Sequence, residues 1–506
     1  MRAPSEWTRA HIISPFINGA QGFVVFLVIV VVQGQQGLRT LLEQEHMLYV
    51  ILGVVGVILL ASVVFVVTFF QWRVNLYRVT DSAVEQRRGL LFKQQRQARL
   101  DRLQAVDVVQ PFLARIFGFA ELSVEVAGGE KSGVQLKFLR LAHAEQLRNH
   151  IIHLASGTAE KPLAIDADDV GVDPVAELSP LSQSDKARAI AAQASPAREV
   201  YKVPVPRLLL STVLTWRFIL AILIPVVFVV ALLVAGNATL EVVREVGIAD
   251  DIAGAFTAIA TAALAALGVT YSYLSRGFNF TAQVAADGIR LRHGMLDTRR
   301  QTVPPGRVQA IRLRQHLLWR RGDWWRVSIN VAGYQDNQTA VSTLLPVGTR
   351  QEALEAVWLV LPDLGDPDPE GTFSAALSGK GEENDFTATP VRSAWFDPLQ
   401  WRYRGTRATD RALLIRRGWL TREVFVVPHE RTQSLGIRQG PLQRLLSLAD
   451  VHVHSTNGPV RPVAQHMDVE DARELLEAQA ERATLSRAVQ TPDQWARIVG
   501  VPQGTL

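Results

Sequence analysis

One stretch of 29 residues occurs three times in this chain, each time in the same register and without a gap. The copies run from Arg87 to Arg115, from Arg292 to Arg320 and from Arg416 to Arg444. The positions identical in all copies are Arg87/Arg292/Arg416, Gly89/Gly294/Gly418, Leu91/Leu296/Leu420, Arg102/Arg307/Arg431, Gln104/Gln309/Gln433, Gln110/Gln315/Gln439, Leu113/Leu318/Leu442 and Arg115/Arg320/Arg444. Matches at fixed spacing indicate a duplicated domain rather than a biased composition. We therefore expect three related domains.

The composition favours a membrane protein and excludes two kinds of site. Hydrophobic residues make up 48% of the 506 residues, which is high for a purely soluble chain. The chain has no cysteine, so disulfide bonds and thiolate metal sites are excluded. The formal net charge of +5 is small for this length, so the placement of the charges matters more than their total.

Two pairs of uncharged apolar segments predict two transmembrane hairpins, and hence four transmembrane helices. The first pair spans residues 12–37 and 47–70, and the second spans residues 218–236 and 252–274. About 20 apolar residues cross a bilayer as a helix. Buried helices of a soluble domain are the alternative, but they seldom exceed about 14 residues without a charge. None of the four segments contains Asp, Glu, Lys, Arg or His, which argues against ion translocation.

The charges that flank these hairpins predict their orientation. The turn of the first hairpin, residues 33–46, has a net charge of −1, and the turn of the second has a net charge of −3. Arg73, Arg78, Arg207 and Arg217 lie on the other side of the predicted spans. Since Lys and Arg accumulate on the cytoplasmic side, both turns should face out of the cell, and both termini and all three repeats should lie in the cytoplasm.

Alternating and β-rich segments followed by one amphipathic helix predict the fold of each repeat. We expect about seven short strands in a bent sheet or partial barrel, capped by a C-terminal helix. Asp468 is the expected N-cap of the last of these helices. The predicted fold class is a multi-domain α+β membrane protein. Its predicted segments are 1–70 for the N-terminal segment and first hairpin, 71–155 for the first domain, 156–205 for an acidic linker, 206–277 for the second hairpin, 278–361 for the second domain, 362–394 for an acidic disordered linker, 395–482 for the third domain and 483–506 for a C-terminal tail.

The repeated motifs resemble a known family. Each copy contains R-x-G-x-L, then R-x-Q-[AS]-aliphatic, then Q-x-x-L-x-R. Together with the hairpins, over residues 12–154 and 206–480, they are similar to bacterial pleckstrin-homology-like (PH-like) membrane proteins of the YdbT type. The resemblance implies three PH-like domains that face the cytoplasm and carry no established enzymatic activity. It also implies a smaller relative with a single PH-like domain as a partner in a membrane complex.

The repeated residues have a structural interpretation, because a residue present in every copy points to the fold. Gly89, Gly294 and Gly418 are expected to need a positive φ in a hairpin. Arg102, Arg307 and Arg431 can lie over the sheet or donate hydrogen bonds to loop carbonyls. Gln110, Gln315 and Gln439 can close the turn before the next strand. A functional role for these arginines and glutamines is the alternative.

Basic charge is concentrated in the front halves of the later repeats. Residues 402–444 carry ten bases and three acids, and residues 280–327 carry the same numbers. Such a surface can contact an anionic inner leaflet or a protein partner. The residues predicted to do so are Arg402, Arg404, Arg407, Arg411, Arg416 and Arg417. A solvated face is the alternative, and nucleic acid is disfavoured because no recognition helix or stacking aromatic motif is present.

Motifs for catalysis are absent from the sequence. It contains no phosphate-binding glycine loop and no GxSxG nucleophile motif. His429, His452, His454 and His466 could bind a metal only if three or four converged, and strand histidines are the favoured interpretation. We therefore expect no cofactor, no metal and no enzymatic activity. The predicted function is an integral membrane scaffold that binds protein partners or anionic lipid, with cell-envelope homeostasis as a suggested setting. The alternative is a transporter or channel subunit, and the sequence leaves the oligomeric state open.

Overall fold

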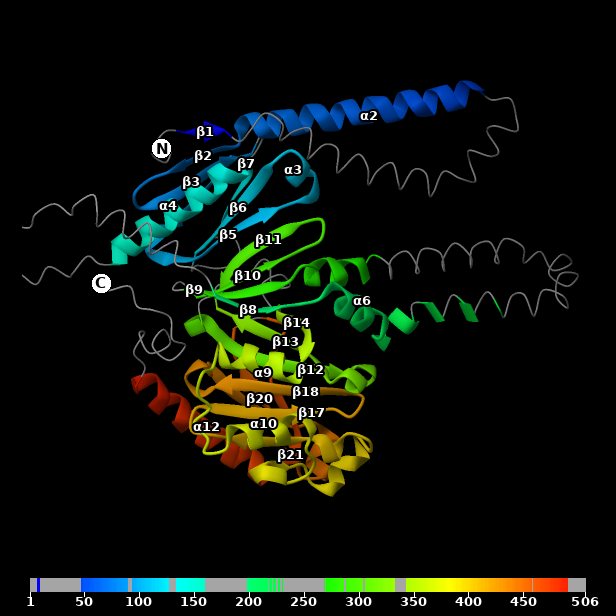
Figure 1. Cartoon of the computed structure of the whole chain (residues 1–506), viewed down its shortest axis with the longest axis vertical. Coiled ribbons are helices and arrows are strands. Elements are labelled where there is room, and N and C mark those ends of the chain that lie inside the picture. The colour runs from blue at the N-terminus through cyan, green and yellow to red at the C-terminus, as the bar shows by residue number, and fades with distance from the viewer. Residues whose placement is uncertain are drawn as a thin grey trace, which may run out of the picture. The chain divides into compact units, whose positions relative to one another are not determined.

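The computed structural model describes two compact units, each considered by itself (Figure 1). Unit 1 contains Met1–Leu178 and Leu296–Gln301, and unit 2 contains Ser179–Met295 and Thr302–Leu506. The described residues are 7–9, 47–89, 93–126, 133–159, 198–216, 218–220, 222–223, 226–227, 230, 268, 270–285, 288–303, 305–332, 343–456 and 458–489.

Unit 1 contains the first repeat. Its elements in chain order are β1 (Thr8–Arg9), α2 (Met47–Val74), β2 (Leu76–Val79), β3 (Ala83–Arg88), β4 (Gln94–Arg99), η1 (Leu100–Arg102), β5 (Leu103–Gln110), α3 (Phe112–Ile116), β6 (Phe119–Val126), β7 (Val134–Arg140) and α4 (Leu141–Ala159). One sheet has the order β1-β2-β3-β4, and β7-β6-β5 belong to a second. Val84, Leu122 and Ile151 are fully buried in a core to which both sheets and α4 contribute.

Unit 2 contains the other two repeats. The second repeat comprises β8 (Arg198–Lys202), α6 (Val205–Val213), β9 (Thr281–Ala285), β10 (Gly288–His293), β11 (Thr298–Val303, which begins in the segment of unit 1), η2 (Pro305–Arg307), β12 (Val308–His316), η3 (Leu317–Gly322), β13 (Trp324–Val331), β14 (Thr343–Thr349) and α9 (Arg350–Trp358). The third comprises α10 (Pro369–Ser378), η4 (Glu383–Asp385), β15 (Thr387–Ala388), η5 (Val391–Trp395), η6 (Trp401–Tyr403), β16 (Gly405–Ala408), β17 (Ala412–Arg417), β18 (Thr421–Pro428), η7 (His429–Arg431), β19 (Ser434–Arg438), α11 (Pro441–Leu445), β20 (Leu448–His454), β21 (Val463–Asp468) and α12 (Val469–Val489).

The three repeats have equivalent elements at the spacing of the sequence repeat. Strands β3, β10 and β17 end immediately before the repeated glycine, and η1, η2 and η7 end at the repeated arginine. Each repeat closes with a helix, α4, α9 or α12. The backbone amide of Glu470 donates to Asp468 Oδ1 at 2.9 Å, as expected of an N-cap before α12. The predicted multi-domain α+β fold with antiparallel sheets and a C-terminal helix is therefore confirmed.

The sheets cross the boundaries between repeats, which the sequence did not predict. Strand β5 of the first repeat pairs antiparallel with β11, and β12 of the second repeat pairs antiparallel with β18 of the third. In unit 2 this produces a seven-stranded sheet of order β14-β13-β12-β18-β17-β16-β15, and the third repeat ends with the sheet β19-β20-β21. A short 3-10 turn precedes β5, β12 and β19 and separates the two sheets of each repeat. The strands before and after this turn therefore do not pair with each other, and β5 and β12 pair with a strand of the next repeat.

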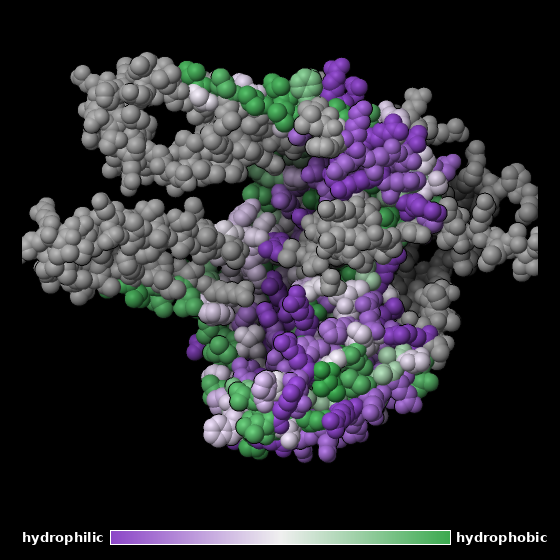
Figure 2. Space-filling model, turned by 180° about the vertical axis from the view of Figure 1, so that it is seen from behind, coloured by the Kyte–Doolittle hydropathy of each residue, from purple (hydrophilic) through white to green (hydrophobic). Residues whose placement is uncertain are grey.

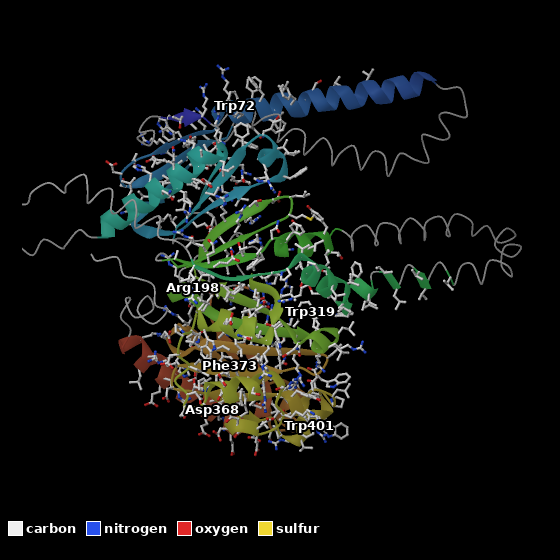
Figure 3. All side chains as sticks on the ribbon, viewed as in Figure 1. Trp72, Arg198, Trp319, Asp368, Phe373 and Trp401 are labelled. Atoms are coloured by element: carbon white, nitrogen blue, oxygen red, sulfur yellow. The ribbon has the colours of Figure 1, made fainter. Side chains whose placement is uncertain are left out.

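The segment from residue 362 to residue 394 is ordered, so its prediction as a disordered linker was wrong. It contains α10, whose N-cap Asp368 accepts a hydrogen bond from the amide of Gly371 at 2.9 Å. Phe373 and Phe386 are buried, and the Phe373 ring packs edge-on against Trp358, with 5.2 Å between ring centroids. Figure 3 labels Phe373 and Asp368 of this segment. Its acidic residues suggested a solvated chain, but several of them pair with arginines of the third repeat.

The predicted transmembrane helices lie largely outside the described residues, as do the turns of both hairpins and most of the predicted linker 156–205. Where the structure describes the chain, no helix is both long enough and apolar enough to cross a membrane. The predicted helix 47–70 falls within α2, on which the large apolar side chains Val55, Leu59 and Phe70 are exposed. Figure 2 shows hydrophobic side chains along α2 and on the described residues that follow α6.

All three repeated glycines have positive φ, as a tight hairpin requires: 109° at Gly89, 126° at Gly294 and 94° at Gly418. A Cβ at Gly418 would collide with the carbonyl oxygen of Thr421. We expect Gly418→Val to destabilise unit 2 by about 1–3 kcal/mol, measured as a lower melting temperature of the purified chain. Gly440→Ala is the matched control, because Gly440 has a φ of −78° and its Cβ would meet only Gln443 Oε1, at 3.5 Å. Equal shifts in both variants would contradict the argument.

Candidate functional site

The six arginines predicted to form one contact surface do not lie together on the surface. Arg404 is 4% exposed and Arg416 is 2% exposed, so neither can meet a membrane. Arg407 is largely covered, whereas the exposed Arg411 pairs with Asp363, with 3.2 Å between Nε and Oδ2. Arg402 is exposed and lies over the Trp401 ring. Most of the predicted surface is therefore wrong, and only Arg417, described below, belongs to the site that the structure shows.

The covered arginines hold the segment that the sequence assigned to a linker. Arg407 Nη2 lies 2.8 Å from Asp366 Oδ2. Arg404 is also covered, but it pairs with Asp397, which lies just after that segment. Arg416 donates to the carbonyl oxygen of Ala375 at 2.7 Å and stacks on the Phe386 ring. Burial lowers the pKa of Arg416 to about 10, partly offset by Glu383, so the guanidinium remains charged at neutral pH. These side chains stabilise the fold and are not available to a ligand.

The repeated glutamines close turns, as their structural interpretation predicts. Gln110 Nε2 donates to the carbonyl oxygen of Phe119 at 3.2 Å, and Gln439 Nε2 donates to that of Leu448 at 3.0 Å. Gln315 instead donates to Asp323 Oδ1 at 2.9 Å. Among the repeated arginines, Arg431 Nε lies 3.8 Å from Glu430 Oε1. The side chain of Arg102 is outside the described residues, and no role is assigned to that of Arg307.

A row of charged side chains crosses four neighbouring strands of the seven-stranded sheet. Arg326 on β13 lies opposite Arg314 on β12, Arg314 lies opposite Glu423 on β18, and Glu423 lies opposite Arg417 on β17. Arg312, two positions before Arg314 on the same strand, projects to the same face. We call Arg312, Arg314, Arg326, Arg417 and Glu423 the arginine row.

Glu423 is the centre of the arginine row. Its Oε1 accepts from Arg314 Nε at 2.7 Å, and its Oε2 accepts from Arg417 Nε at 2.8 Å. Arg312 Nη1 lies 3.8 Å from Oε1. Burial raises the pKa of Glu423, but the attraction of Arg314 and Arg417 outweighs it, so the pKa lies below its ordinary value. Glu423 is therefore an anion at neutral pH.

One carboxylate does not neutralise this group of guanidiniums. Burial lowers the pKa of Arg312 to about 10, and Arg314 adds to the effect, so Arg312 still carries its charge at neutral pH. Arg326 lies over the Tyr273 ring, with its Cζ 4.3 Å from the ring centroid. The Nε atoms of Arg312 and Arg326 and the hydroxyl of Tyr273 are buried without a hydrogen-bond partner among the described residues. The arginine row thus has positive charge and unused donors, which suit an anionic ligand.

The arginine row lies at the end of its strands that is near α6 and the helical residues 270–277. Tyr273 belongs to the helical residues 270–277, which form the C-terminal end of the range predicted for the second hairpin. At the same end, Trp319 of η3 donates from Nε1 to the carbonyl oxygen of Ser211 in α6, at 2.9 Å; Figure 3 shows Trp319 beside α6. Arg320 of η3 donates to the carbonyl oxygen of Trp419, in the turn between β17 and β18. Contacts therefore connect this end of the sheet to α6 and to the helical residues 270–277.

The equivalent positions in unit 1 carry a different set of charges. There Glu121 lies opposite Val109, and Val109 lies opposite Arg299. Glu121 Oε1 lies 3.9 Å from Lys137 Nζ. Burial raises the pKa of Glu121, and Lys137 and Arg299 only partly offset this. A cluster of arginines thus occurs in one of the two equivalent junctions, as expected of a specialised site rather than of a requirement of the fold.

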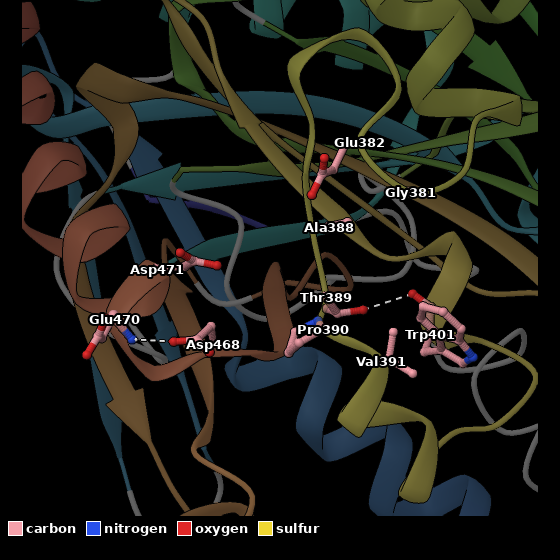
Figure 4. Close-up of a pocket in the computed structure, with 10 residues that line it drawn as sticks. All are labelled: Gly381, Glu382, Ala388, Thr389, Pro390, Val391, Trp401, Asp468, Glu470 and Asp471. Atoms are coloured by element: carbon pink, nitrogen blue, oxygen red, sulfur yellow. Dashed lines mark hydrogen bonds between the residues drawn. The ribbon is translucent and has the colours of Figure 1, made fainter.

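An open pocket in the third repeat has the opposite charge (Figure 4). Its volume is about 610 Å³, and four carboxylate residues line it: Glu382, Asp468, Glu470 and Asp471. No Lys or Arg is among its lining residues. Burial and the neighbouring Glu474 raise the pKa of Asp471. This pocket does not suit an anionic ligand.

The histidines do not form a metal site among the residues that the structure describes, where no group of His, Asp and Glu is arranged to hold an ion. His452 and His454 stack with 6.0 Å between ring centroids, while the buried His429 bonds through Nε2 to the carbonyl oxygen of Thr409 at 2.8 Å. His466 lies instead between Asp397 and Asp450.

Sequence reasoning missed Arg312, Arg314, Arg326 and Tyr273. The signal was present, because the basic stretch 280–327 contains the first three of these residues. It was not decisive, since only the pairing of β12 with β18 brings Arg314 and Arg417 to the same carboxylate.

The chain is similar in sequence to a known domain family along most of its length. The family model described as Bacterial PH domain matches three separate segments, residues 25–155, 205–357 and 385–483. Each segment contains one copy of the repeat. No curated protein matches the chain. With its three matched segments, and with the repeated strands and closing helices that the structure shows, this chain belongs to the bacterial PH domain family.

Proposed function

We propose that this protein is a non-catalytic membrane protein that binds the headgroup of an anionic phospholipid on the arginine row. The observation that carries the proposal is the row itself: three guanidiniums share the carboxylate of Glu423, and a fourth, that of Arg326, lies over the Tyr273 ring. Arginine donates two parallel hydrogen bonds to phosphate oxygens, and a site near the bilayer surface attracts anionic lipid.

The apolar surface of the neighbouring helices supports a membrane location. Trp216, Ile219, Val226 and Val230, which follow α6, are all exposed large apolar side chains. Exposed side chains of this kind in a continuous segment are typical of contact with lipid. With arginines on the inner side, the proposal places the PH-like domains in the cytoplasm. A smaller protein with one PH-like domain is the proposed protein partner.

The test is to measure lipid binding to the full chain. Purified protein in mild detergent would be titrated with short-chain phosphatidylglycerol or phosphatidylcholine, and bound lipid counted by native mass spectrometry. We expect preferential binding of phosphatidylglycerol that weakens as salt rises. Arg314→Gln with Arg326→Gln should weaken binding by about 1 kcal/mol per arginine, or roughly 30-fold together.

The matched control is Arg402→Gln with Arg411→Gln, which removes the same charge from exposed positions outside the row. It should leave lipid binding nearly unchanged. Equal losses in both double variants, or equal binding of the two lipids, would contradict the proposal. Unchanged melting temperatures would show that the variants remain folded.

A further inference from the structure

The two junctions between repeats use the same strand register. In the first junction Gln110, Val109 and Val108 lie opposite Thr298, Arg299 and Arg300. In the second, Gln315, Arg314 and Leu313 lie opposite Arg422, Glu423 and Val424. The paired residues of the first junction and those of the second occupy equivalent positions of the sequence repeat. The first strand of one repeat's second sheet therefore recognises the last strand of the next repeat's first sheet in one fixed way.

Two strands of these same kinds are left over at the ends of the array. Strand β4 is equivalent to β11 and β18, and it is the last strand in the order β1-β2-β3-β4. Strand β19 is equivalent to β5 and β12, and it is the first strand in the order β19-β20-β21. Within the described part of the chain each has one neighbour in its sheet. The other edge of each presents backbone donors and acceptors that can pair with a further strand.

The two edges are exposed and carry compatible side chains. Gln94, Gln95 and Gln97 of β4 are exposed, and Ile437 of β19 is 41% exposed. β19 has five residues, whereas β5 has eight and β12 has nine, as expected for a strand that lacks its second partner.

We propose that β19 of one copy of this protein pairs antiparallel with β4 of a second copy, so that the chains associate head to tail. The register of the two internal junctions places Leu435 opposite Gln97, Ile437 opposite Gln95 and Arg438 opposite Gln94. In this register no two like charges are directly opposed. The second copy is the occupant because every copy carries both complementary edges. Repetition of such a contact produces a ring or an open filament.

The absence of cysteine allows a direct test by disulfide cross-linking. Two variants of the full chain, Gln95→Cys and Ile437→Cys, would be purified separately in detergent, mixed and oxidised. Directly opposed residues have Cα atoms about 4.5–5.5 Å apart, within the range of about 4.4–6.8 Å that a disulfide needs. We expect a disulfide between the Gln95→Cys chain and the Ile437→Cys chain. A link within one chain cannot form, because each variant has a single cysteine.

The control moves one cysteine by two residues along the same face. Gln97→Cys mixed with Ile437→Cys places the thiols on diagonal positions, whose Cα atoms are about 7 Å apart or more. The in-register pair should cross-link several-fold more than this pair, and native mass spectrometry of the unmodified chain should show assemblies of two or more copies. Equal cross-linking of both mixtures would overturn the register. Only single chains in the mass spectrum, with no cross-link, would overturn the association.

Discussion

Replacing Glu423 with glutamine should destabilise unit 2 by about 3 kcal/mol or more. Removal of one partner from a buried ion pair leaves the other charges uncompensated, which typically costs about 3–5 kcal/mol. Here three guanidiniums depend on one carboxylate, and its side chain is 8% exposed. Glutamine keeps the shape of the side chain and removes only the charge. The measurement is chemical denaturation of the purified chain, monitored by tryptophan fluorescence.

The pH dependence of the same variant checks the cause. The pKa of Glu423 in the folded protein is below its ordinary value, so the stability it contributes is complete above the unfolded pKa and is lost as pH falls through the folded pKa. The melting temperatures of the wild type and Glu423→Gln should therefore differ most near pH 7 and converge as the pH falls below about 4. Asp363→Asn, which breaks the exposed pair with Arg411, should change the melting temperature little at any pH. A difference between wild type and Glu423→Gln that does not depend on pH would show that packing rather than charge is responsible.

Replacing Phe373 with alanine should destabilise the third repeat by about 3–5 kcal/mol, the usual cost of removing a buried phenylalanine ring. The ring is fully buried, it packs against Trp358, and α10 on which it lies contacts β17 and β18. If residues 362–394 were a disordered linker, the same change would have no effect. Because the segment is packed, limited proteolysis of the full chain should cut it faster in Phe373→Ala than in the wild type.

Trp395→Ala is the control for this experiment. Trp395 directly follows the segment 362–394, but its side chain is 85% exposed. Its removal should therefore change the free energy of unfolding by less than about 0.5 kcal/mol. Equal resistance of wild type and Phe373→Ala to protease and denaturant would contradict the packing argument.

Local rules made parts of the fold predictable from the sequence. The hairpin at Gly418 depends on the backbone conformation of that residue. The N-cap at Asp468 depends on a side chain three residues or fewer from its partner. Each can therefore be predicted from a few consecutive residues of the sequence. Repetition added the equivalence of the three domains. These features need no knowledge of distant contacts.

The arginine row and the ordered acidic segment could not be predicted in the same way. Arg314 and Glu423 are 109 positions apart, and their contact exists only because β12 pairs with β18. The composition of residues 362–394 is that of a solvated linker, but Asp366 and the carbonyl oxygen of Ala375 serve as partners for Arg407 and Arg416. Charge along the sequence showed how many arginines there are, but not which of them are already neutralised.

Because β12 pairs with β18, the boundaries of the repeat in the sequence differ from the boundaries of the folded sheet. A fragment cut at the sequence boundary, residues 395–482, would begin with the edge of β18 exposed and would lack the carbonyl groups that bind Arg416. Such a fragment should aggregate, although its sequence is a complete repeat. A cut that retains the whole seven-stranded sheet, from β12 onward, follows the folded unit. The duplicated sequence unit therefore does not form a closed sheet by itself, because its strands pair with strands of the neighbouring repeats.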